Sequence, residues 1–173
     1  MKPDEDDYQA FVDARYARLV RAAILFGCGV QDAEDAVQDA LIRCYGAWGR
    51  VSGADDRDAY VYRVLVNGIT RSRRRRWRGE IPYQELPEPV PTDDPATAVS
   101  LSQSIRASLD RLGQEHRQVL VLRYFADLTE AQIATVLGIA PGTVKSRASR
   151  AIAALSEDPS LSDLVTRTHQ EKS

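Results

Sequence analysis

Apolar residues recur every three to four positions along most of this chain, which is the spacing of one face of an α-helix. A first apolar stripe runs from Tyr8 to Ile24. A second stripe runs from Ala33 to Trp48, and Asp32 is expected to cap the helix that carries it. A third stripe runs from Val61 to Ile69. The pattern therefore predicts three N-terminal helices that pack their apolar faces together.

The second half of the chain shows the same periodicity and ends in a helix-turn-helix pattern. Thr129 and Gln132 have the spacing of a reciprocal capping box at the start of a helix. Gly138 suits the left-handed residue that ends that helix, and Pro141 suits the first turn of the next one. Together with apolar stripes over residues 101–112 and 119–125, this predicts a four-helix C-terminal unit.

The helix expected to begin at Pro141 is basic and carries no acidic residue as far as Leu155. A short basic helix with hydroxyl side chains after a tight turn is suited to reading a DNA major groove. An ordinary helical hairpin with a solvated basic face would show the same local pattern. The residues expected to face inward are Val144, Ala148, Ala151, Ile152 and Leu155. Those expected to face outward are Thr143, Lys145, Ser146, Arg147, Ser149 and Arg150.

The two halves are separated by residues 79–98, which hold five of the eight prolines, five acidic residues and no basic one. Proline at this density excludes a regular helix and favours extended geometry. We therefore predict an all-α protein of two small helical domains, residues 1–78 and 99–157, joined by a Pro-rich acidic linker over 79–98. The linker is either a passive spacer or an acidic segment that lies in a basic channel. A C-terminal tail covers 158–173.

Composition narrows the class of protein. With 173 residues, 43% hydrophobic and 28% charged, the chain is expected to be globular. No apolar run approaches the roughly 18 residues of a membrane span, and the acidic N-terminus is unlike a secretory signal. We therefore expect a cytoplasmic protein without membrane contact. Cys28 and Cys44 stand alone, which argues against a metal site or a disulfide framework, and no cofactor is expected.

The net charge is only −2, but the basic residues are concentrated. Residues 57–78 carry a net charge of +7, between two segments of −5 each, and residues 141–155 carry +3. Six arginines lie between Arg71 and Arg78, with Trp77 among them. Charges this dense repel one another, and a polyanion relieves the repulsion. The two basic segments therefore suggest two separate contacts with nucleic acid.

The second predicted helix carries acidic and amide side chains on its outer face. Asp32, Glu34 and Asp35 lie in its first turn, where the helix dipole alone explains them. Gln38 and Asp39 lie further along and favour a docking face for a basic partner helix. A carboxylate metal site is the weaker interpretation, because no His or second acidic cluster supplies the remaining ligands.

A loop is predicted over Gly49–Asp58, before the third helix, because of its Gly, Ser and Asp content. On the third helix, Tyr60 and Tyr62 fit either a core position or a base-stacking position.

Three stretches of the chain resemble bacterial RNA polymerase sigma factors of the extracytoplasmic-function (ECF) group. They are DAEDAVQDALIRCY (Asp32–Tyr45), YVYRVLVNGITRSRRRR (Tyr60–Arg76) and LRYFADLTEAQIATVLGIAPGTVKSRASRAIAAL (Leu122–Leu155). Their order and spacing are also similar, the resemblance covers about residues 8–156, and it is greatest to actinobacterial members. It implies a protein without enzymatic activity that binds core RNA polymerase, recognises promoters and leaves after initiation.

The resemblance also implies a role for each candidate surface. One set would bind core polymerase at the clamp helices of its largest subunit, namely Asp32, Asp35, Gln38, Asp39 and Ile42. A second would hold the melted −10 element, namely Tyr60, Arg63, Asn67, Arg71, Arg74 and Arg75, with the loop over residues 49–58 forming the pocket for a flipped base. A third would read the −35 duplex, namely Thr143, Lys145, Ser146, Arg147, Ser149 and Arg150. The flap of the second-largest polymerase subunit and an anti-sigma protein are further partners that the family suggests.

The sequence departs from the family pattern in three places. Gly113 stands where proline is usual, Ala140 where a capping serine is common, and Ser149 where some members have a bulkier residue. Two other functions remain open: a helix-turn-helix regulator that acts without polymerase, and a sigma-like decoy that binds only a regulatory protein. The first leaves the acidic face and the arginine run unexplained, and the second leaves the basic surfaces unexplained. A nuclease has the least support, because no constellation of carboxylates and metal ligands appears.

Overall fold

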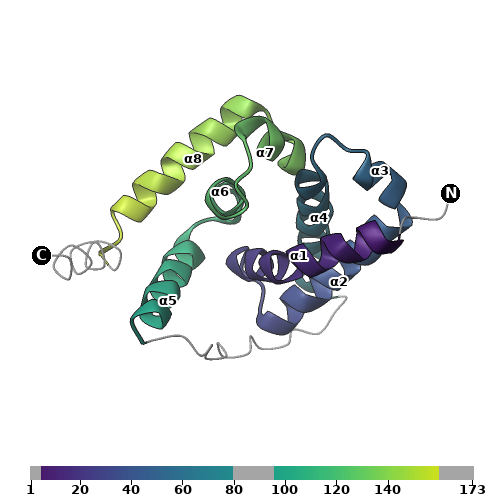
Figure 1. Cartoon of the computed structure of the whole chain (residues 1–173). Coiled ribbons are helices and arrows are strands. Elements are labelled where there is room, and N and C mark those ends of the chain that lie inside the picture. The colour runs from purple at the N-terminus through teal and green to yellow at the C-terminus, as the bar shows by residue number, and fades with distance from the viewer. Residues whose placement is uncertain (1–4, 80–95, 160–173) are drawn as a thin grey trace, which may run out of the picture.

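The computed structural model describes residues 5–79 and 96–159, apart from the side chains of residues 96–102. All regular secondary structure in these two ranges is helical, and it forms two groups (Figure 1). The N-terminal group contains α1 (Glu5–Leu25), α2 (Val30–Gly46), α3 (Trp48–Ser52) and α4 (Arg57–Trp77). The C-terminal group contains α5 (Ala96–Arg111), α6 (Gln114–Leu120), a π-helical turn η1 (Val121–Phe125), α7 (Glu130–Leu137) and α8 (Pro141–Ser156). The prediction of an all-α protein with two helical domains is confirmed.

The core of the N-terminal group lies between α1, α2 and α4. Each helix contributes a stripe of fully buried apolar side chains, including Ala23 of α1, Val37 of α2 and Leu65 of α4. Small side chains such as Ala22 and Ala33 are completely buried as well, so that the helix backbones approach closely. The predicted apolar stripes therefore form the expected core, and α2 and α4 are held beside each other.

Two local predictions for this group are wrong. Gly29, not Asp32, is the N-cap of α2, and Asp32 lies in the first turn of the helix. The predicted loop over residues 49–58 is shorter, because α3 extends to Ser52 and α4 begins at Arg57. Trp48 and Val51 are buried, and the apolar surface that α3 removes from water outweighs the weak helix propensity of its glycine and serine.

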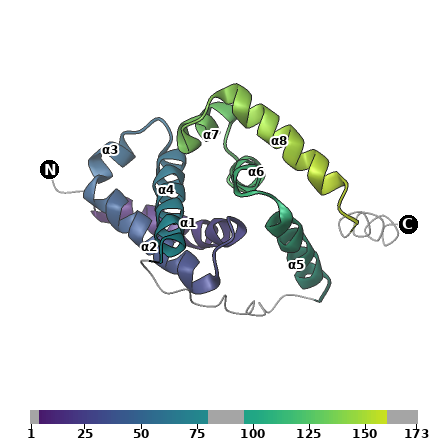
Figure 2. The same cartoon turned by 180° about the vertical axis from the view of Figure 1, so that it is seen from behind.

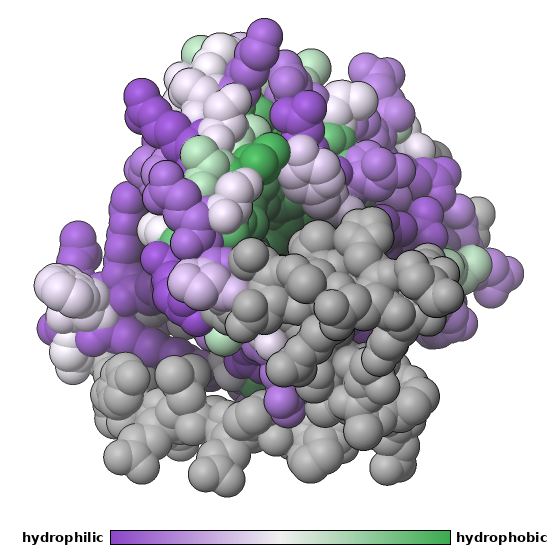
Figure 3. Space-filling model, turned by 90° about the vertical axis from the view of Figure 1, so that its left-hand side faces the viewer, coloured by the Kyte–Doolittle hydropathy of each residue, from purple (hydrophilic) through white to green (hydrophobic). Residues whose placement is uncertain are grey.

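The helical segments of the C-terminal group surround a second set of buried apolar residues. Val119, Ile133 and Val144 are fully buried between α6, α7 and α8. Seen from the side where α5 and α8 lie in Figure 1, an apolar hollow has hydrophilic residues above it and at its sides (Figure 3). Ile152 was expected to face inward, but it is 42% exposed, because α8 extends past the helices that cover its first half.

Most of the predicted linker, residues 80–95, and most of the predicted tail, residues 160–173, lie outside the described residues. The last three residues of the predicted linker, 96–98, already belong to α5. At the start of the tail, Asp158 is buried and accepts a hydrogen bond from Arg111 of α5 at 2.9 Å. Of the helices that the structure describes, none is long and apolar enough to cross a membrane.

The two helical groups are packed against each other. In both views of the ribbon, α7 lies against the N-terminal end of α4, and α6 lies beside the C-terminal end of α1 (Figures 1 and 2). The buried apolar residues of both groups belong to one hydrophobic cluster. The side that α4 presents to α7 and α6 is therefore occupied by the protein itself, and the rest of its surface faces α1, α2, α3 or solvent.

Candidate nucleic-acid interface

The outer face of α2 presents acidic and amide groups to solvent. Asp35, Gln38, Asp39 and Ile42 are all exposed, Ile42 by 68%. Their spacing of three and four residues places them on one side of the helix, because α2 buries the opposite side against α1 and α4. An exposed isoleucine within an acidic row offers an apolar contact that a basic partner helix can cover.

Asp32 differs from the rest of this predicted set because it already has a partner within the protein. Both of its carboxylate oxygens accept hydrogen bonds from the guanidinium of Arg76, at 2.6 and 2.7 Å. This charged hydrogen bond lowers the pKa of Asp32 below its ordinary value. Asp32 therefore links the start of α2 to the end of α4, and Asp35 is the first exposed acid of the predicted set.

The opposite sign of charge follows α4. Arg63, Asn67, Arg71 and Arg74 are exposed and are spaced by four, four and three residues, so they form one row along the helix. Asp56 caps the helix by accepting a hydrogen bond from the amide of Ala59 at 2.9 Å. The row lies on a continuous helix of 21 residues, which fixes the spacing of its side chains.

The arginines at the end of α4 divide into two groups. Arg73 donates a hydrogen bond to the carbonyl of Phe26 at 2.6 Å and another to Gln114 of α6, and Arg76 is paired with Asp32. Both side chains are half-buried. Arg71, Arg74 and Arg75, which were predicted to hold the melted −10 element, are exposed. The arginine run therefore serves both the fold and the surface.

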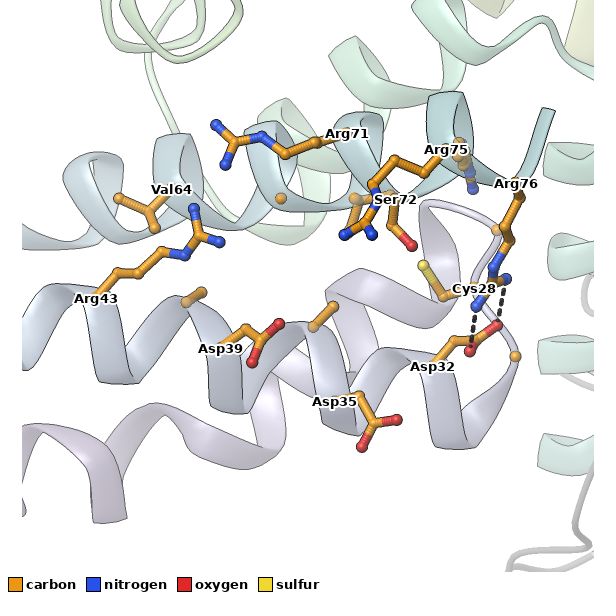
Figure 4. Close-up of a pocket in the computed structure, with 17 residues that line it drawn as sticks. Cys28, Asp32, Asp35, Asp39, Arg43, Val64, Arg71, Ser72, Arg75 and Arg76 are labelled. Atoms are coloured by element: carbon orange, nitrogen blue, oxygen red, sulfur yellow. Dashed lines mark hydrogen bonds and ion pairs between the residues drawn. The ribbon is translucent and has the colours of Figure 1, made fainter. Parts of the chain in front are cut away.

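A cleft with a volume of about 290 Å³ separates α2 from the second half of α4 (Figure 4). Asp39 and Arg43 point into it from α2, and Ser72 points into it from α4, whereas Asp35 points away. Arg71 and Arg75 also line the cleft. Acidic and basic side chains therefore meet here, and the acidic face and the arginine row are neighbouring surfaces of the N-terminal group.

The aromatic residues of α4 occupy three different environments. Tyr62 is buried, and this burial raises its pKa to about 12, so it is a core residue. Tyr60 is half-buried at the start of the helix. Trp77 is 92% exposed at the end of the helix, next to Arg76 and Arg78. An indole ring this exposed beside guanidinium groups is a platform on which a base can stack.

The helix-turn-helix has the geometry that its sequence predicts. Thr129 and Gln132 form the reciprocal capping box, with hydrogen bonds of 2.6 and 3.3 Å. Gly138 ends α7 in the left-handed conformation with φ of 65°. Pro141 lies in the first turn of α8, after Ala140, which provides no side-chain cap. Lys145, Ser146, Ser149 and Arg150 are exposed on α8, and Thr143 is half-buried.

Arg147 is not fully outward-facing as the sequence suggested. Its side chain is only 20% exposed, and one guanidinium nitrogen lies 2.8 Å from a carboxylate oxygen of Glu115 in α6. Periodicity places Arg147 beside the apolar face of α8, but only the packing of α6 against α8 shows that an acid is within reach. The predicted set on α8 therefore divides into one exposed row, the half-buried Thr143, and Arg147, which pairs with Glu115.

Sequence reasoning missed the most buried arginine of the described chain. Arg117 of α6 is 7% exposed; it donates a hydrogen bond to the carbonyl of Leu109 at 2.7 Å and pairs with Asp110 at 3.1 Å. Burial lowers its pKa. Its guanidinium lies against Gly27, which has a φ of +96°. The only sequence signal was the glycine itself, because nothing local links two residues 90 positions apart.

The remaining candidate chemistry is structural. Cys28 and Cys44 are buried, and burial raises the pKa of Cys44 to about 11. Within residues 5–79 and 96–159, no group of three or more His, Cys, Asp or Glu side chains is arranged to hold a metal ion.

Two family models match this chain: Sigma-70 region 2 over residues 11–79 and Sigma-70, region 4 over residues 102–155. The RNA polymerase sigma-E factor of Streptomyces coelicolor is 34% identical over 161 residues, which are 93% of this chain and 90% of that protein. The ECF RNA polymerase sigma factor SigL of Mycobacterium tuberculosis is 37% identical over 155 residues, 85% of each chain. These relatives include the actinobacterial members that the sequence suggested.

Solved structures agree with the fold. The sigma factor RpoE of Bartonella quintana, in complex with the anti-sigma factor NepR, gives a TM-score of 0.72 at 22% identity and covers 87% of this chain and 95% of that one. The structure of CnrH in complex with the cytosolic domain of CnrY gives a TM-score of 0.64 at 24% identity and covers 88% of this chain and 87% of that one. With both sigma regions matched in order on two helical groups, the chain belongs to the ECF RNA polymerase sigma factors, which are transcription initiation factors and not enzymes.

Proposed function

We propose that this sigma factor binds core RNA polymerase through the outer face of α2, holds the melted −10 element along α4, and reads the −35 duplex with α8. The observation that carries this proposal is the exposed row of Arg63, Asn67, Arg71 and Arg74 beside the exposed acidic face of α2. A regulator that binds only duplex DNA has no use for such a pair of neighbouring, oppositely charged surfaces.

The chemistry of the α4 row suits a separated strand. Extruding a base from a duplex costs a few kcal/mol of stacking and pairing free energy. The exposed arginines offset part of this cost by neutralising phosphates, and the amide of Asn67 offers both a donor and an acceptor to an unpaired base. The short loop over residues 53–56 lies at the N-terminal end of α4. In this proposal, the loop forms one side of the pocket that receives the unpaired base.

The α8 surface suits an intact duplex. Lys145 and Arg150 provide phosphate or base-edge contacts, and the hydroxyls of Ser146 and Ser149 provide weaker hydrogen bonds. The reciprocal cap on α7 and the left-handed Gly138 fix the angle between the two helices. The DNA-reading helix is therefore presented by a rigid turn, as docking in a groove requires.

An anti-sigma protein is the further partner that we propose. One solved neighbour was determined in complex with an anti-sigma factor and the other in complex with the cytosolic domain of CnrY, and both structures cover most of this chain. The acidic face of α2 and the apolar side chains left exposed on the C-terminal group, such as Ile105 and Ile152, are the surfaces available to it.

Gel filtration of the full chain with core RNA polymerase tests the proposal directly. We expect the protein to elute with core, and the complex to protect both promoter elements of one duplex, whereas the free protein binds only the −35 element of the same duplex. A helix-turn-helix regulator would bind the duplex without joining core. A decoy would join neither core nor DNA.

A further inference from the structure

The cleft between α2 and α4 forms because small residues stand where the two helices lie side by side. On α4, Gly68 lines the cleft, and a Cβ atom there would meet no atom outside its own stretch of helix within 4 Å. On α2, Ala36 and Ala40 line the opposite side, one helical turn apart. The two helices therefore leave a hollow of about 290 Å³ between them at this level.

Charged side chains stand at the two ends of the cleft. At one end, the pair between Asp32 and Arg76 links α2 to α4 through two hydrogen bonds. At the other end, Arg43 extends from α2 toward α4 and lies beside Val64 (Figure 4). The distance along α4 from Val64 to Arg76 is about 18 Å at the rise of an α-helix. A cleft of this length and volume has the size of the smaller pockets that bind small-molecule ligands.

The acidic side chains that line the cleft differ in their availability to a ligand. Asp32 is held by Arg76, and Asp35 points away from the cleft (Figure 4). Asp39 points into it. Among the described residues that line the cleft, Asp39 is therefore the carboxylate placed to accept a hydrogen bond from an N–H or O–H group of a ligand.

Basic and hydroxyl side chains supply the complementary chemistry. Arg43 of α2 and Arg71 and Arg75 of α4 line the cleft, and all three are exposed. The half-buried Ser72 points into the cleft from α4 (Figure 4). A guanidinium binds a phosphate through two parallel hydrogen bonds, and a hydroxyl donates one more. Three guanidinium groups around one inward carboxylate favour an anionic ligand that also carries hydrogen-bond donors.

We propose that the cleft between α2 and α4 binds a nucleotide. Arg43, Arg71 and the hydroxyl of Ser72 hold its phosphates, and Asp39 accepts a hydrogen bond from its base or sugar. The phosphate of a DNA strand offers the same chemistry to the arginines. The hollow around Gly68 favours the free nucleotide, because a strand that runs along the exposed row of α4 does not need an internal space.

A bound nucleotide would occupy one residue of each neighbouring surface. Asp39 belongs to the proposed polymerase-binding face, and Arg71 belongs to the row proposed for the melted strand. A nucleotide in the cleft therefore competes with both partners. This consequence rests on the proposed function, whereas the binding site does not.

Two variants with different physical effects test the site. Gly68→Leu fills the hollow without changing any charge, and leucine is a stronger helix former than glycine. Arg43→Gln with Ser72→Ala removes two phosphate contacts and leaves the hollow open. None of these three residues is assigned to DNA or polymerase.

The matched control is Arg21→Gln with Ser52→Ala. Arg21 is exposed on α1, and Ser52 is half-buried on α3. The control therefore removes the same charge and the same hydroxyl group from positions that do not line the cleft. Circular dichroism and thermal unfolding show whether each variant is folded.

Isothermal titration calorimetry of the full chain, without DNA, polymerase or Mg²⁺, measures binding. The probes are ATP and GTP, which carry a triphosphate on two different bases, together with pyrophosphate and adenosine. We expect wild type and control to bind at least one of the two nucleotides at a single site, pyrophosphate more weakly, and adenosine not detectably. We expect Gly68→Leu and the Arg43→Gln, Ser72→Ala variant to bind that nucleotide roughly tenfold more weakly or worse.

Two results of the calorimetry would overturn the nucleotide site. One is the absence of saturable binding of ATP and GTP by wild type. The other is a control that loses as much affinity as the Arg43→Gln, Ser72→Ala variant, because binding would then report only the overall charge of the protein.

A short single-stranded oligonucleotide separates the two sources of phosphate. If it binds in a way that depends on Arg43 and Ser72, while ATP, GTP and pyrophosphate do not bind, the cleft belongs to the path of the strand and the proposal is wrong. If core polymerase does not bind the protein, the proposed function fails, while the calorimetry still decides the nucleotide site.

Discussion

Among single residues, the ion pair between Asp32 and Arg76 makes the clearest prediction for stability. Because Arg76 lowers the pKa of Asp32 in the folded state, the pair stabilises the protein above the unfolded pKa of about 4, and this contribution is lost as the pH falls through the folded pKa. Both side chains are one-third exposed, so we expect Asp32→Asn to lower the free energy of unfolding at pH 7 by about 1 kcal/mol or less.

Urea denaturation measures this effect. The difference between wild type and Asp32→Asn should shrink steadily as the pH is lowered below about 4, because the wild-type carboxylate then takes up its proton. Asp13→Asn, on the exposed surface of α1, is the control and should change stability little at any pH. A difference that stays constant down to the lowest pH would contradict the assigned ion pair.

The pair between Glu115 and Arg147 makes a prediction for DNA binding. Glu115→Gln keeps the size of the side chain and removes the charge that holds Arg147, so we expect the −35 duplex to bind roughly two- to fivefold more tightly. Arg147→Ala should weaken the same binding by about 1–3 kcal/mol if this arginine reaches a base. Fluorescence anisotropy with a labelled duplex measures both.

The control for this pair is Glu130→Gln, because Glu130 pairs with Arg123 and lies on α7 rather than against α8. If both glutamine variants bind DNA equally well, the gain reflects only the lost negative charge.

Neither Arg147 nor Asp32 could be assigned to its partner from the sequence, since each pair depends on how two distant helices pack.

On the scale of single elements, α2 carries the proposed contact with polymerase. Asp35→Arg with Gln38→Arg reverses the charge of the exposed face, and we expect it to abolish co-elution with core polymerase while the fold persists. The matched control is Asp13→Arg with Gln9→Arg, which places the same changes on exposed residues of α1, four positions apart. Equal binding of core by both double variants would refute the assignment of α2.

The helix α4 carries the proposed contact with the melted strand. We expect Asn67→Ala to impair promoter opening in the presence of core polymerase, because its amide is the exposed group suited to an unpaired base. Permanganate reactivity of unpaired thymines measures opening, and gel shift on an unmelted duplex measures closed-complex binding. We expect Asn67→Ala to reduce promoter opening more than it reduces closed-complex binding. An equal reduction of both would count against a role of Asn67 in the melted state.

The elements also show which features the sequence can predict. The cap at Thr129, the turn at Gly138 and the start of α8 at Pro141 were correct, because each depends on residues within one helical turn. The short helix α3 was missed, because its stability comes from burying Trp48 and Val51 against other helices rather than from local propensity.

For the whole molecule, the two-domain division followed from composition, whereas the docking of the domains did not. The proline-rich acidic stretch separates two periodic regions, and that contrast is visible in the sequence. The contact between Gly27 and Arg117 has no local signal in the sequence, because a glycine after a helix and a basic residue on a short helix are both common. The sequence therefore predicts the surfaces but not whether the free protein presents them in one rigid body.

Run-off transcription by purified core polymerase, with this protein added and a library of promoter fragments as template, tests the central claim most directly. We expect transcripts with defined start sites from fragments that carry two elements at a fixed spacing, and none from core alone. The transcripts should disappear with the Asp35→Arg, Gln38→Arg variant and persist with its α1 control. Absence of start-specific transcripts from every fragment, or undiminished transcription with the α2 variant, would contradict the account.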